Sequence, residues 1–471
     1  MNQDSFVLRG ARVIDPANKF DAVADLVVKN GKIYKVSKSR FEVPSSQVTD
    51  VEGKWIIPGQ IDTHAHVAGI SRDVDPSLGY GMLAKAGTTT VVDMGGTGKS
   101  MIDGIKRNGA GLNVAGQFAL IPGLTIPSDQ PSKGEIASTV SDALRQGCIG
   151  LKMLGGYHPF SPETTSQIVR EANAQGAYIA FHIGSKDSGS HLGGLREVPG
   201  IVEKGRMHVC HVNSYCRGVV KDPVDECQEA INIMKTLKGQ INTEVYHAVA
   251  NGTNGACDKS GNVIANVPRN CLAARGYEPT IDGMREAIKD GYASVIAVKS
   301  GAISYVDGKE ALEIYNKSKT MVGMSFPVNL PASAYHLTTA KDESGDFVVD
   351  AVSTDGGSHP RNVAIQSTMA LVKFGALSPS DMANKLSWMP SRMLGLLGKG
   401  HFSEGADADI TIIDPNSGKP TMSFVDGLPI GMQIIGRRHA DEDLLAISAA
   451  FERARPWFQS YIELEEKHNG S

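Results

Sequence analysis

Residues 55–69 read WIIPGQIDTHAHVAG, an apolar run that ends in two histidines, His64 and His66. Because side chains alternate between the two faces of an extended strand, residues that lie two apart point the same way. Both imidazoles can therefore converge on one point. Neutral imidazole is the commonest protein ligand for zinc and similar divalent ions. The stretch thus indicates a metal site whose other ligands come from elsewhere, although a bare pair of this kind also occurs on solvated strand faces.

The composition is that of an ordinary globular protein and excludes several classes of partner. The chain has 471 residues, 41% hydrophobic and 21% charged, which allows one large domain and a smaller one. The net charge is -4 without a basic cluster, so we expect no nucleic acid and no anionic membrane surface as partner. The first residues lack an apolar signal region, and no apolar run approaches the roughly 20 residues that span a bilayer. We therefore expect a cytoplasmic protein, and its six scattered cysteines fit reduced thiols.

The pattern of apolar runs predicts an α/β fold with two parts. Residues 5–54 contain short alternating runs between turn signals, which is typical of a small β-sandwich. From residue 55, short apolar runs alternate with helical stretches, as in repeated βα units. There are eight such runs: WIIPGQID, TTTVVDM, NVAGQFALI, CIGLKML, AYIAFHI, MHVCHV, INTEVYH and FVVDAVSTD. Eight parallel strands predict a (β/α)₈ barrel with its active site at the carboxyl ends of the strands.

We divide the chain accordingly. Residues 1–54 are the first part of the sandwich, residues 55–398 the barrel, and residues 399–427 the returning sandwich strands. Residues 249–345 form an insertion between the seventh and eighth runs, far longer than the usual connection of about 2 to 6 residues. We expect this insertion to be a lid or subdomain that shapes the substrate pocket. Residues 428–471 are a separate tail.

Further candidate ligands lie at the carboxyl ends of later runs. Lys152 lies near the carboxyl end of the fourth run among apolar neighbours. A buried lysine at this position indicates a function. Alternatively, its stem covers apolar surface while the amine stays in water. His182 ends the fifth run. In the sixth run, His208 and His211 are three residues apart and should face opposite sides of a strand. We expect His211 to be the ligand and His208 to face the helical layer. Asp355 ends the eighth run, where its alternative role is to open a Gly-Gly turn.

Both ends of the chain resemble one family. The phrase PGQIDTHAH, following the short strands of VLRGARVIDPANKFDAVADLVVKNGKIYKV, resembles the opening of metal-dependent amidohydrolases of the hydantoinase, dihydroorotase and D-aminoacylase branch. The phrase FSEGADADITIID resembles their returning sandwich strands, so the likeness covers roughly residues 5–421. It implies a TIM barrel with a small β-sandwich built from both chain ends.

The resemblance also implies a binuclear site. Two divalent metal ions, zinc in our prediction, would be held by six residues: His64, His66, Lys152, His182, His211 and Asp355. Relatives with two metals carry a carboxylated lysine at the position of Lys152, whose carbamate bridges the ions. Asp355 would contact a metal and act as the catalytic acid and base. Tyr157 has a spacing from Lys152 similar to that of the hydantoinase tyrosine, which stabilises the oxyanion.

These features predict a hydrolase that cleaves a carbon–nitrogen bond in a small amide, cyclic imide or ureide, or N-acyl amino acid through water activated by the metals. We also expect a homo-oligomer. The phrase STDGGSHP and the short spacing from His182 to His211 favour D-aminoacylase and isoaspartyl dipeptidase relatives, whereas Lys152 with Tyr157 favours hydantoinases. One alternative is a mononuclear deaminase, although the HxxxE motif of those enzymes does not follow His182. Another is a non-hydrolytic subunit or scaffold, since HAHVAG resembles the formyl-transferring subunit of formylmethanofuran dehydrogenase.

Two other phrases do not support different chemistry. GGTGKS at residues 95–100 resembles the end of a phosphate-binding loop, but Asp93 stands where the first glycine of GxxxxGKS is required. The tail resembles the closing segment of amidase-signature enzymes, whose Gly/Ser-rich catalytic segment the chain lacks. We expect this tail to pack against the protein without carrying chemistry. No catalytic role is predicted for four further histidines: His158, His191, His247 and His359.

Overall fold

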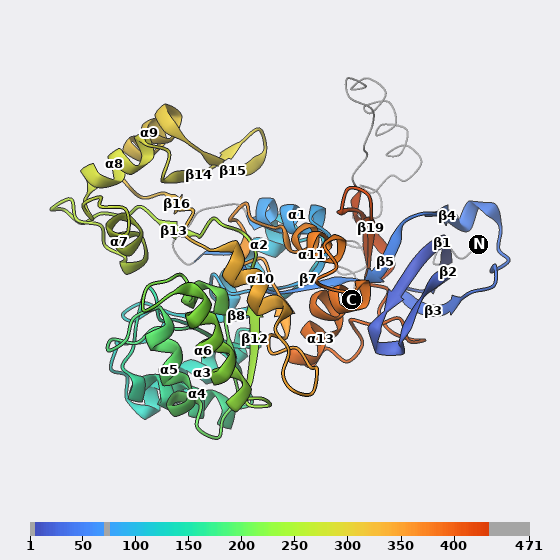
Figure 1. Ribbon diagram of the computed structural model, residues 1–471, viewed down its shortest axis with the longest axis horizontal. Coiled ribbons are helices and arrows are strands. Elements are labelled where there is room, and N and C mark those ends of the chain that lie inside the picture. Colours follow the sequence, from blue (N-terminus) through green and yellow to red (C-terminus); the bar gives the residue numbers. More distant parts are fainter. Residues whose placement is uncertain (1–4, 70–75, 433–471) are drawn as a thin grey trace.

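The computed structural model describes residues 5–69 and 76–432, and its centre is a parallel barrel (Figure 1). The barrel sheet has the order β17-β12-β11-β10-β9-β8-β7-β6-β18. Its strands are β6 (Gln60–His66), β7 (Thr88–Asp93), β8 (Asn113–Leu120), β9 (Gly150–Leu154), β10 (Tyr178–His182), β11 (Met207–Val209), β12 (Ile241–Val245), β17 (Ala351–Val352) and β18 (Gly356–Gly357). All neighbouring strands run parallel, which confirms the predicted (β/α)₈ barrel.

The eighth position of the barrel is a divided strand. β17 pairs with β12, whereas β18 pairs with β6, so the two short strands together close the ring. Between them, residues 353–355 leave the ladder, and Asp355 adopts a left-handed backbone with φ 46°. This break lies at the carboxyl end of β17, where a barrel places its chemistry. It turns the end of the eighth run towards the barrel axis.

Helices surround the barrel and cover its apolar side. They are α1 (Pro76–Lys85), α2 (Gly98–Asn108), α3 (Lys133–Arg145), α4 (Pro162–Ala174), α5 (Leu192–Val202), α6 (Pro223–Thr236), α10 (Pro331–Thr339), α11 (Ala364–Lys373), α12 (Pro379–Ala383), the π-helical turn η4 (Asn384–Trp388) and α13 (Met389–Met393). Hydroxyl side chains start several of them, because a serine or threonine oxygen satisfies the free backbone N–H groups of a first turn. The GGTGKS phrase has this role: Thr97 and Ser100 form the capping box of α2.

A second sheet unites the two ends of the described chain. Its path is β21-β20-β19-β5-β1-β2-β3, with β4 against β1. The strands are β1 (Ser5–Asp15), β2 (Phe20–Lys29), β3 (Lys32–Ser37), β4 (Val48–Asp50), β5 (Trp55–Pro58), β19 (Ile410–Asp414), β20 (Lys419–Val425) and β21 (Leu428–Met432). Three short 3₁₀ turns complete the chain: η1 (Pro16–Asn18), η2 (Ser45–Gln47) and η3 (Val212–Tyr215). The sheet has its own apolar core, which includes Leu8, Leu26, Ile56 and Ile410.

The first predicted run is divided between the two sheets. Trp55–Pro58 is β5, which pairs with β1 and β19 in the second sheet, and only Gln60–His66 enters the barrel. Gly59 marks the crossing, and its N–H donates to the Asp409 carbonyl at 2.8 Å. A Cβ at this position would lie 2.2 Å from Thr89 Oγ1, so the chain passes here where only glycine fits. The run WIIPGQID, which we predicted as one barrel strand, is therefore divided between two sheets.

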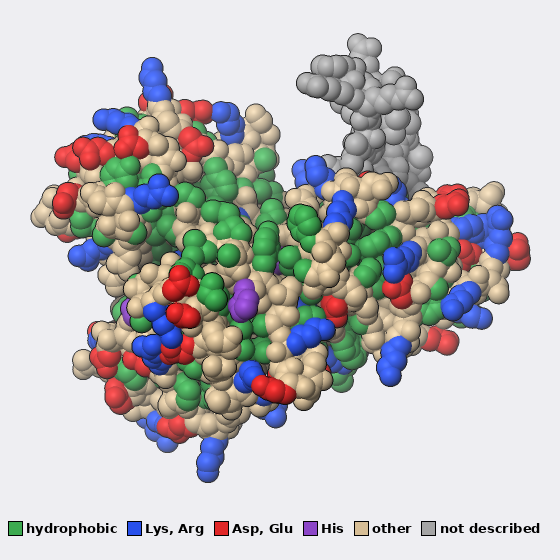
Figure 2. All heavy atoms as spheres, viewed as in Figure 1, with side chains coloured by type: hydrophobic (Ala, Val, Ile, Leu, Met, Phe, Trp, Pro, Cys, Tyr) green, Lys and Arg blue, Asp and Glu red, His purple; other side chains and the backbone are tan. Residues whose placement is uncertain are grey.

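The insertion forms a lobe beside the barrel (Figures 1 and 2). Its antiparallel sheet has the order β13-β16-β14-β15. The elements are β13 (Thr253–Asn254), α7 (Asn266–Ala273), α8 (Ile281–Lys289), β14 (Ser294–Lys299), β15 (Ala302–Val306), α9 (Gly308–Lys317) and β16 (Gly323–Ser325). A separate core that includes Leu272, Met284, Val295 and Phe326 holds the lobe together. The outer face of the lobe carries charged side chains of both signs (Figure 2).

The tail is described only at its start. The strand predicted for PIGMQIIG begins within β21, which extends the second sheet beside β20. The helix predicted after it lies outside the described residues. Within the part of the chain that the structure describes, no helix is both long and apolar enough to cross a membrane. All six cysteines are free.

We predict that Gly59→Ala destabilises the protein while Gly81→Ala does not. Overpacking at the crossing should lower the free energy of unfolding by about 1–3 kcal/mol, because Thr89 and Asp409 leave no room for a methyl group. Gly81 lies in α1, has no atom within 4 Å of its added Cβ, and should gain roughly 0.5–1 kcal/mol from the better helix former. Thermal unfolding of both variants measures the difference. Equal melting temperatures would contradict the tight crossing.

Candidate metal centre and active site

The two histidines of β6 converge as the sequence predicts. His64 is fully buried and His66 is partly exposed to the pocket. Their Nε2 atoms lie only 3.1 Å apart. Two such atoms have no reason to meet in a buried place unless a proton or a cation lies between them. The strand geometry thus produces the convergence, and a bound cation or a shared proton would stabilise it.

Asp355 adds a carboxylate to this pair. Its Oδ1 lies 3.4 Å from His64 Nε2 and 3.3 Å from His66 Nε2. One ligand atom from each of these three residues falls within 4.8 Å of the others, a spacing that one metal ion can bridge. The Asp355 N–H donates to the His64 carbonyl at 2.9 Å, which ties the broken eighth strand to β6. Asp62 supports the same junction, because its carboxylate accepts from His64 N and from Thr354 N and Oγ1.

Arg361 keeps Asp355 ionised. Its Nη2 lies 2.7 Å from Asp355 Oδ2, on the side of the carboxylate away from the histidines. Burial opposes ionisation, but Arg361 and the nearby imidazoles outweigh it and hold the pKa of Asp355 well below its usual range. Oδ1 therefore remains a negatively charged acceptor that faces His64 and His66. The sequence offered no sign of Arg361, which follows Asp355 by six residues in a loop.

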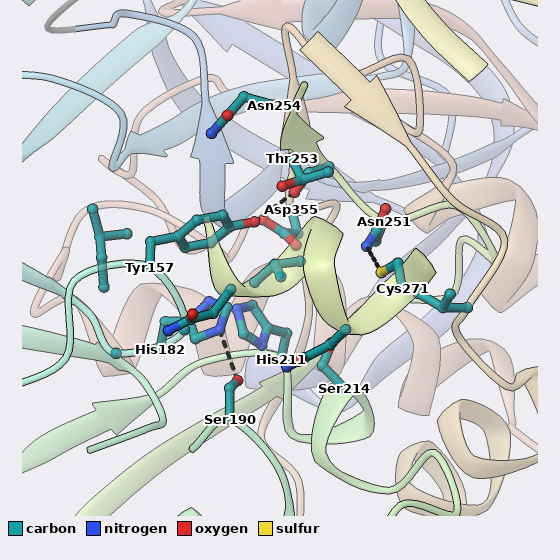
Figure 3. Close-up of a pocket in the computed structure, with 18 of the residues that line it drawn as sticks. Tyr157, His182, Ser190, His211, Ser214, Asn251, Thr253, Asn254, Cys271 and Asp355 are labelled. Carbon is teal, nitrogen blue, oxygen red and sulfur yellow. Dashed lines mark hydrogen bonds between the residues drawn. The ribbon is translucent and has the colours of Figure 1, made fainter. Parts of the chain in front are cut away.

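His182 and His211 form a second pair beside the first. Their ring centroids are 4.5 Å apart, and the His211 ring lies 5.1 Å from that of His64. Figure 3 shows both rings at the floor of the pocket, with His182 Nε2 2.9 Å from Ser190 Oγ. Burial lowers the pKa of His182 to about 3 and that of His211 well below its usual value. Both imidazoles are therefore neutral, which is the form that binds metals.

Lys152 lies inside the barrel beside His64. The side chain is fully buried on β9. Its Nζ lies 3.2 Å from His64 Nε2 and donates to Cys210 Sγ at 2.8 Å. Among the described residues it forms no ion pair with a carboxylate, an unusual position for a cationic lysine. Lys152 thus faces the site instead of covering apolar surface.

Glu244 is a central residue that the sequence reasoning missed. It is fully buried on β12, and its Oε1 accepts from His64 Nδ1 at 2.6 Å and from His211 N at 2.9 Å. An acceptor at Nδ1 places the imidazole proton there and leaves Nε2 of His64 free for a metal. Burial raises the pKa of Glu244, and the His211 N–H opposes this shift. Glu244 is a charged residue inside the apolar run INTEVYH. Like Lys152 in its run, it could have been recognised from the sequence as a candidate site residue.

The prediction for His208 was wrong. It was expected to face the helical layer, but it lies inside the barrel, fully buried, with Nε2 3.8 Å from Glu244 Oε1. The alternation rule failed because β11 ends at Val209 and His211 has a left-handed backbone with φ 33°. His208 and His211 therefore both point to the barrel axis, at different levels. Cys210, between them, reaches Lys152.

The Tyr157 ring lies beside His182, with the two ring centroids 5.6 Å apart. Its hydroxyl donates to the Gly252 carbonyl at 2.7 Å, so it contacts the start of the insertion (Figure 3). The pocket has a volume of about 920 Å³ and is lined by barrel loops and by α7 of the insertion. Burial raises the pKa of the Tyr157 phenol, which keeps its proton available for hydrogen bonding.

The remaining histidines have separate places. His247 bonds Ser367 and Thr338 in the helical layer. His191 begins α5 and accepts from Gly193 N. His158 and His359 line the pocket.

The assembled donor atoms fit a divalent ion such as zinc. Neutral imidazole nitrogens and carboxylate oxygens are its usual protein ligands. His64, His66 and Asp355 offer three such atoms at hydrogen-bond distances from one another. His211 Nδ1 is buried without a hydrogen-bond partner among the described residues, as a ligand atom would be. The chemistry of the donor set therefore fits a divalent metal ion.

A model of the amidohydrolase family matches residues 55–436, a range that contains all six predicted ligands. The chain belongs to the amidohydrolase family. Membership indicates a hydrolase of carbon–nitrogen bonds other than peptide bonds. It also agrees with the resemblance seen in PGQIDTHAH, and it supports the use of divalent metal by this amidohydrolase.

Individual relatives are distant but cover nearly the whole amidohydrolase chain. The dihydroorotase of Trichlorobacter lovleyi is 23% identical over 465 residues, covering 87% of this chain and 90% of that protein. N-acyl-D-glutamate deacylase from Bordetella bronchiseptica, solved with zinc and a phosphonate inhibitor, has a TM-score of 0.66 at 15% identity and covers 92% and 98% of the two chains. A chain of the formyltransferase/hydrolase complex from Methylorubrum extorquens has a TM-score of 0.58 at 16% identity, with coverage of 96% and 94%. Each of these two structures resembles this protein in fold.

We predict that Glu244→Gln weakens metal binding by about 10- to 100-fold, because the His64 tautomer loses its carboxylate acceptor. Glu226→Gln is the matched control: Glu226 is equally buried but accepts from Gly218 and Val220 at the start of α6. Competition with a chromophoric chelator measures metal affinity in both variants. Equal affinities would show that Glu244 serves only the packing of the barrel.

Proposed function

We propose that this amidohydrolase holds two zinc ions and uses them to hydrolyse a small amide, cyclic imide, ureide or N-acyl amino acid. His64, His66 and Asp355 would hold one ion, and His182 and His211 the other. Lys152, as its carbamate, would supply an oxygen to each. The approach of the His64 and His66 Nε2 atoms to Asp355 Oδ1 carries this proposal.

Carboxylation of Lys152 is consistent with its surroundings. A protonated amine 3.2 Å from His64 Nε2 would repel an ion bound at that nitrogen. Reaction with carbon dioxide replaces this positive charge with a negative one and adds two oxygen atoms. The carbamate would then balance part of the charge of two dications in a buried place.

The metals would supply activation, and the chain would supply proton transfer. When bound, such ions polarise a scissile carbonyl and lower the pKa of a water molecule. Asp355 Oδ1 then takes a proton from the attacking water and passes it to the departing nitrogen. Arg361 holds Oδ2, so the carboxylate keeps its orientation while Oδ1 gains and loses the proton. Asp62 accepts from His64 N and Thr354 N, and so holds the backbone of β6 and of the segment before Asp355 in place.

Tyr157 would donate to the oxyanion of the tetrahedral intermediate. For this its hydroxyl must leave the Gly252 carbonyl, to which it donates at 2.7 Å. The exchange links oxyanion binding to the position of the insertion. An oxyanion donor is worth about 10²–10³ in rate.

A second candidate is a subunit that performs its hydrolysis within a larger assembly. The likeness to a chain of the formyltransferase/hydrolase complex, over 96% of the sequence, favours this candidate. In that case the purified chain would keep its metals but turn over small free substrates poorly. Light scattering of the isolated chain would separate this case from a self-sufficient homo-oligomer.

We predict that Asp355→Asn lowers kcat by about 10²–10⁴-fold with the fold retained, because the amide cannot accept the proton. Asp350→Asn is the control, since Asp350 lies five residues earlier, is half-buried and accepts from Thr243 N away from the proposed metal ligands. A panel of hydantoins, dihydropyrimidines, N-acyl amino acids and β-aspartyl dipeptides should contain at least one substrate of the zinc-loaded protein. An unchanged kcat with only a raised KM would make Asp355 a binding residue.

A further inference from the structure

The pocket contains more positive charge than its own residues neutralise. Three arginines line it, Arg217, Arg275 and Arg361, whereas Asp355 is the only carboxylate residue among the described lining residues. Arg361 is already paired with Asp355. Within residues 5–69 and 76–432, neither Arg217 nor Arg275 forms an ion pair. Bound dications would add further positive charge, so the cavity favours an anion.

Arg217 is held in place by a neutral partner. Its Nε and Nη2 both donate to Asn329 Oδ1, at 3.0 Å for Nε. Asn329 is itself buried, and its Nδ2 donates to Tyr246 Oη at 2.6 Å and to the Ala248 carbonyl at 3.0 Å. This arrangement orients the guanidinium without cancelling its charge. Three of its five N–H donors remain for a ligand.

Arg217 also lies near the predicted metals. It follows His211 by six residues, at the end of the η3 turn, and the side chain is half-buried in the pocket wall. His182 and His211 line the same pocket as Arg217. A group bound to Arg217 would therefore lie in the same pocket as the proposed metal ligands.

Arg275 differs from Arg217 in being exposed. Its guanidinium lies over the Tyr292 ring at 4.8 Å, at the side of the pocket formed by the insertion. No buried acceptor of the kind that fixes Arg217 is found for it in the described part of the chain. It can attract an anion to the pocket but does not orient one.

We infer that Arg217 binds a carboxylate of the substrate, so that the enzyme acts on N-acyl amino acids or carboxylated cyclic amides instead of neutral hydantoins and imides. The inference rests on the proposed function and narrows its substrate class. A planar guanidinium matches a carboxylate with two parallel hydrogen bonds. A neutral substrate would cover Arg217 without pairing it, which carries a desolvation penalty.

The test uses substrates that differ only in the carboxylate. Dihydroorotate and dihydrouracil form one pair, and N-acetyl-D-methionine and its amide form another. The zinc-loaded wild type should favour the carboxylated member of at least one pair in kcat/KM. Arg217→Gln should lower that preference by about 10- to 100-fold, mainly through KM, since charged hydrogen bonds of this kind are lost. Arg217→Lys should retain part of the preference, because it keeps the charge but loses the fork.

Arg285→Gln is the matched control, an arginine in the insertion that bonds Asp282 and Asn316 away from the pocket. It should leave both members of each pair unchanged. Melting temperature and zinc content of Arg217→Gln must equal those of the wild type. A wild-type preference for the neutral members, or an equal loss for both members in Arg217→Gln, would overturn the inference.

Calorimetric binding of the same four compounds separates this inference from the proposed hydrolysis. If none is turned over but the carboxylated members bind and Arg217→Gln removes that binding, the anion site stands and hydrolysis of these substrates fails. If hydrolysis occurs without discrimination in either assay, the proposed function stands and the anion site fails. If no carboxylated member binds more tightly than its neutral partner, Arg217 is not a carboxylate site.

Discussion

The hydrogen bond between His64 Nδ1 and Glu244 Oε1 is the contact on which the rest of the site depends. It crosses the barrel from β6 to β12 at 2.6 Å, and the same oxygen accepts the His211 N–H. One buried carboxylate therefore sets the tautomer of one ligand and the backbone of another. The free Nε2 of His64 then meets His66, Asp355 and Lys152 at 3.1–3.4 Å. A bound cation would give these buried polar atoms a common partner.

Local sequence patterns predicted the barrel and the ends of its strands, because run length and side-chain alternation follow from backbone geometry alone. They failed where a contact is made by residues distant in sequence. The role of Glu244 depends on the contact between β12 and His64 of β6. The role of Arg361 depends on its loop folding back onto Asp355. The alternation rule misplaced His208 because the chain leaves the strand before His211. Pro58 and Gly59 interrupt the first apolar run, but local sequence did not show that the chain changes sheets there.

The insertion contacts the site through its two connections to the barrel. Near its start, the Gly252 carbonyl accepts from Tyr157 and the Ala250 carbonyl accepts from Arg361. Near its end, Asn329 holds Arg217. A movement of the lobe would therefore reach the proposed oxyanion donor, the partner of the catalytic carboxylate and the proposed anion site together. Under the proposed function, substrate selection would therefore depend in part on the insertion.

The most direct test of this account is anomalous diffraction at the zinc edge from crystals of the zinc-loaded protein. We predict two peaks. One should be bounded by His64, His66 and Asp355 and the other by His182 and His211, with continuous density for a carbamate on the Nζ of Lys152 between them. A single peak with an unmodified Lys152 would contradict the binuclear centre and favour the mononuclear deaminase alternative. No peak at these residues would contradict the metal centre itself.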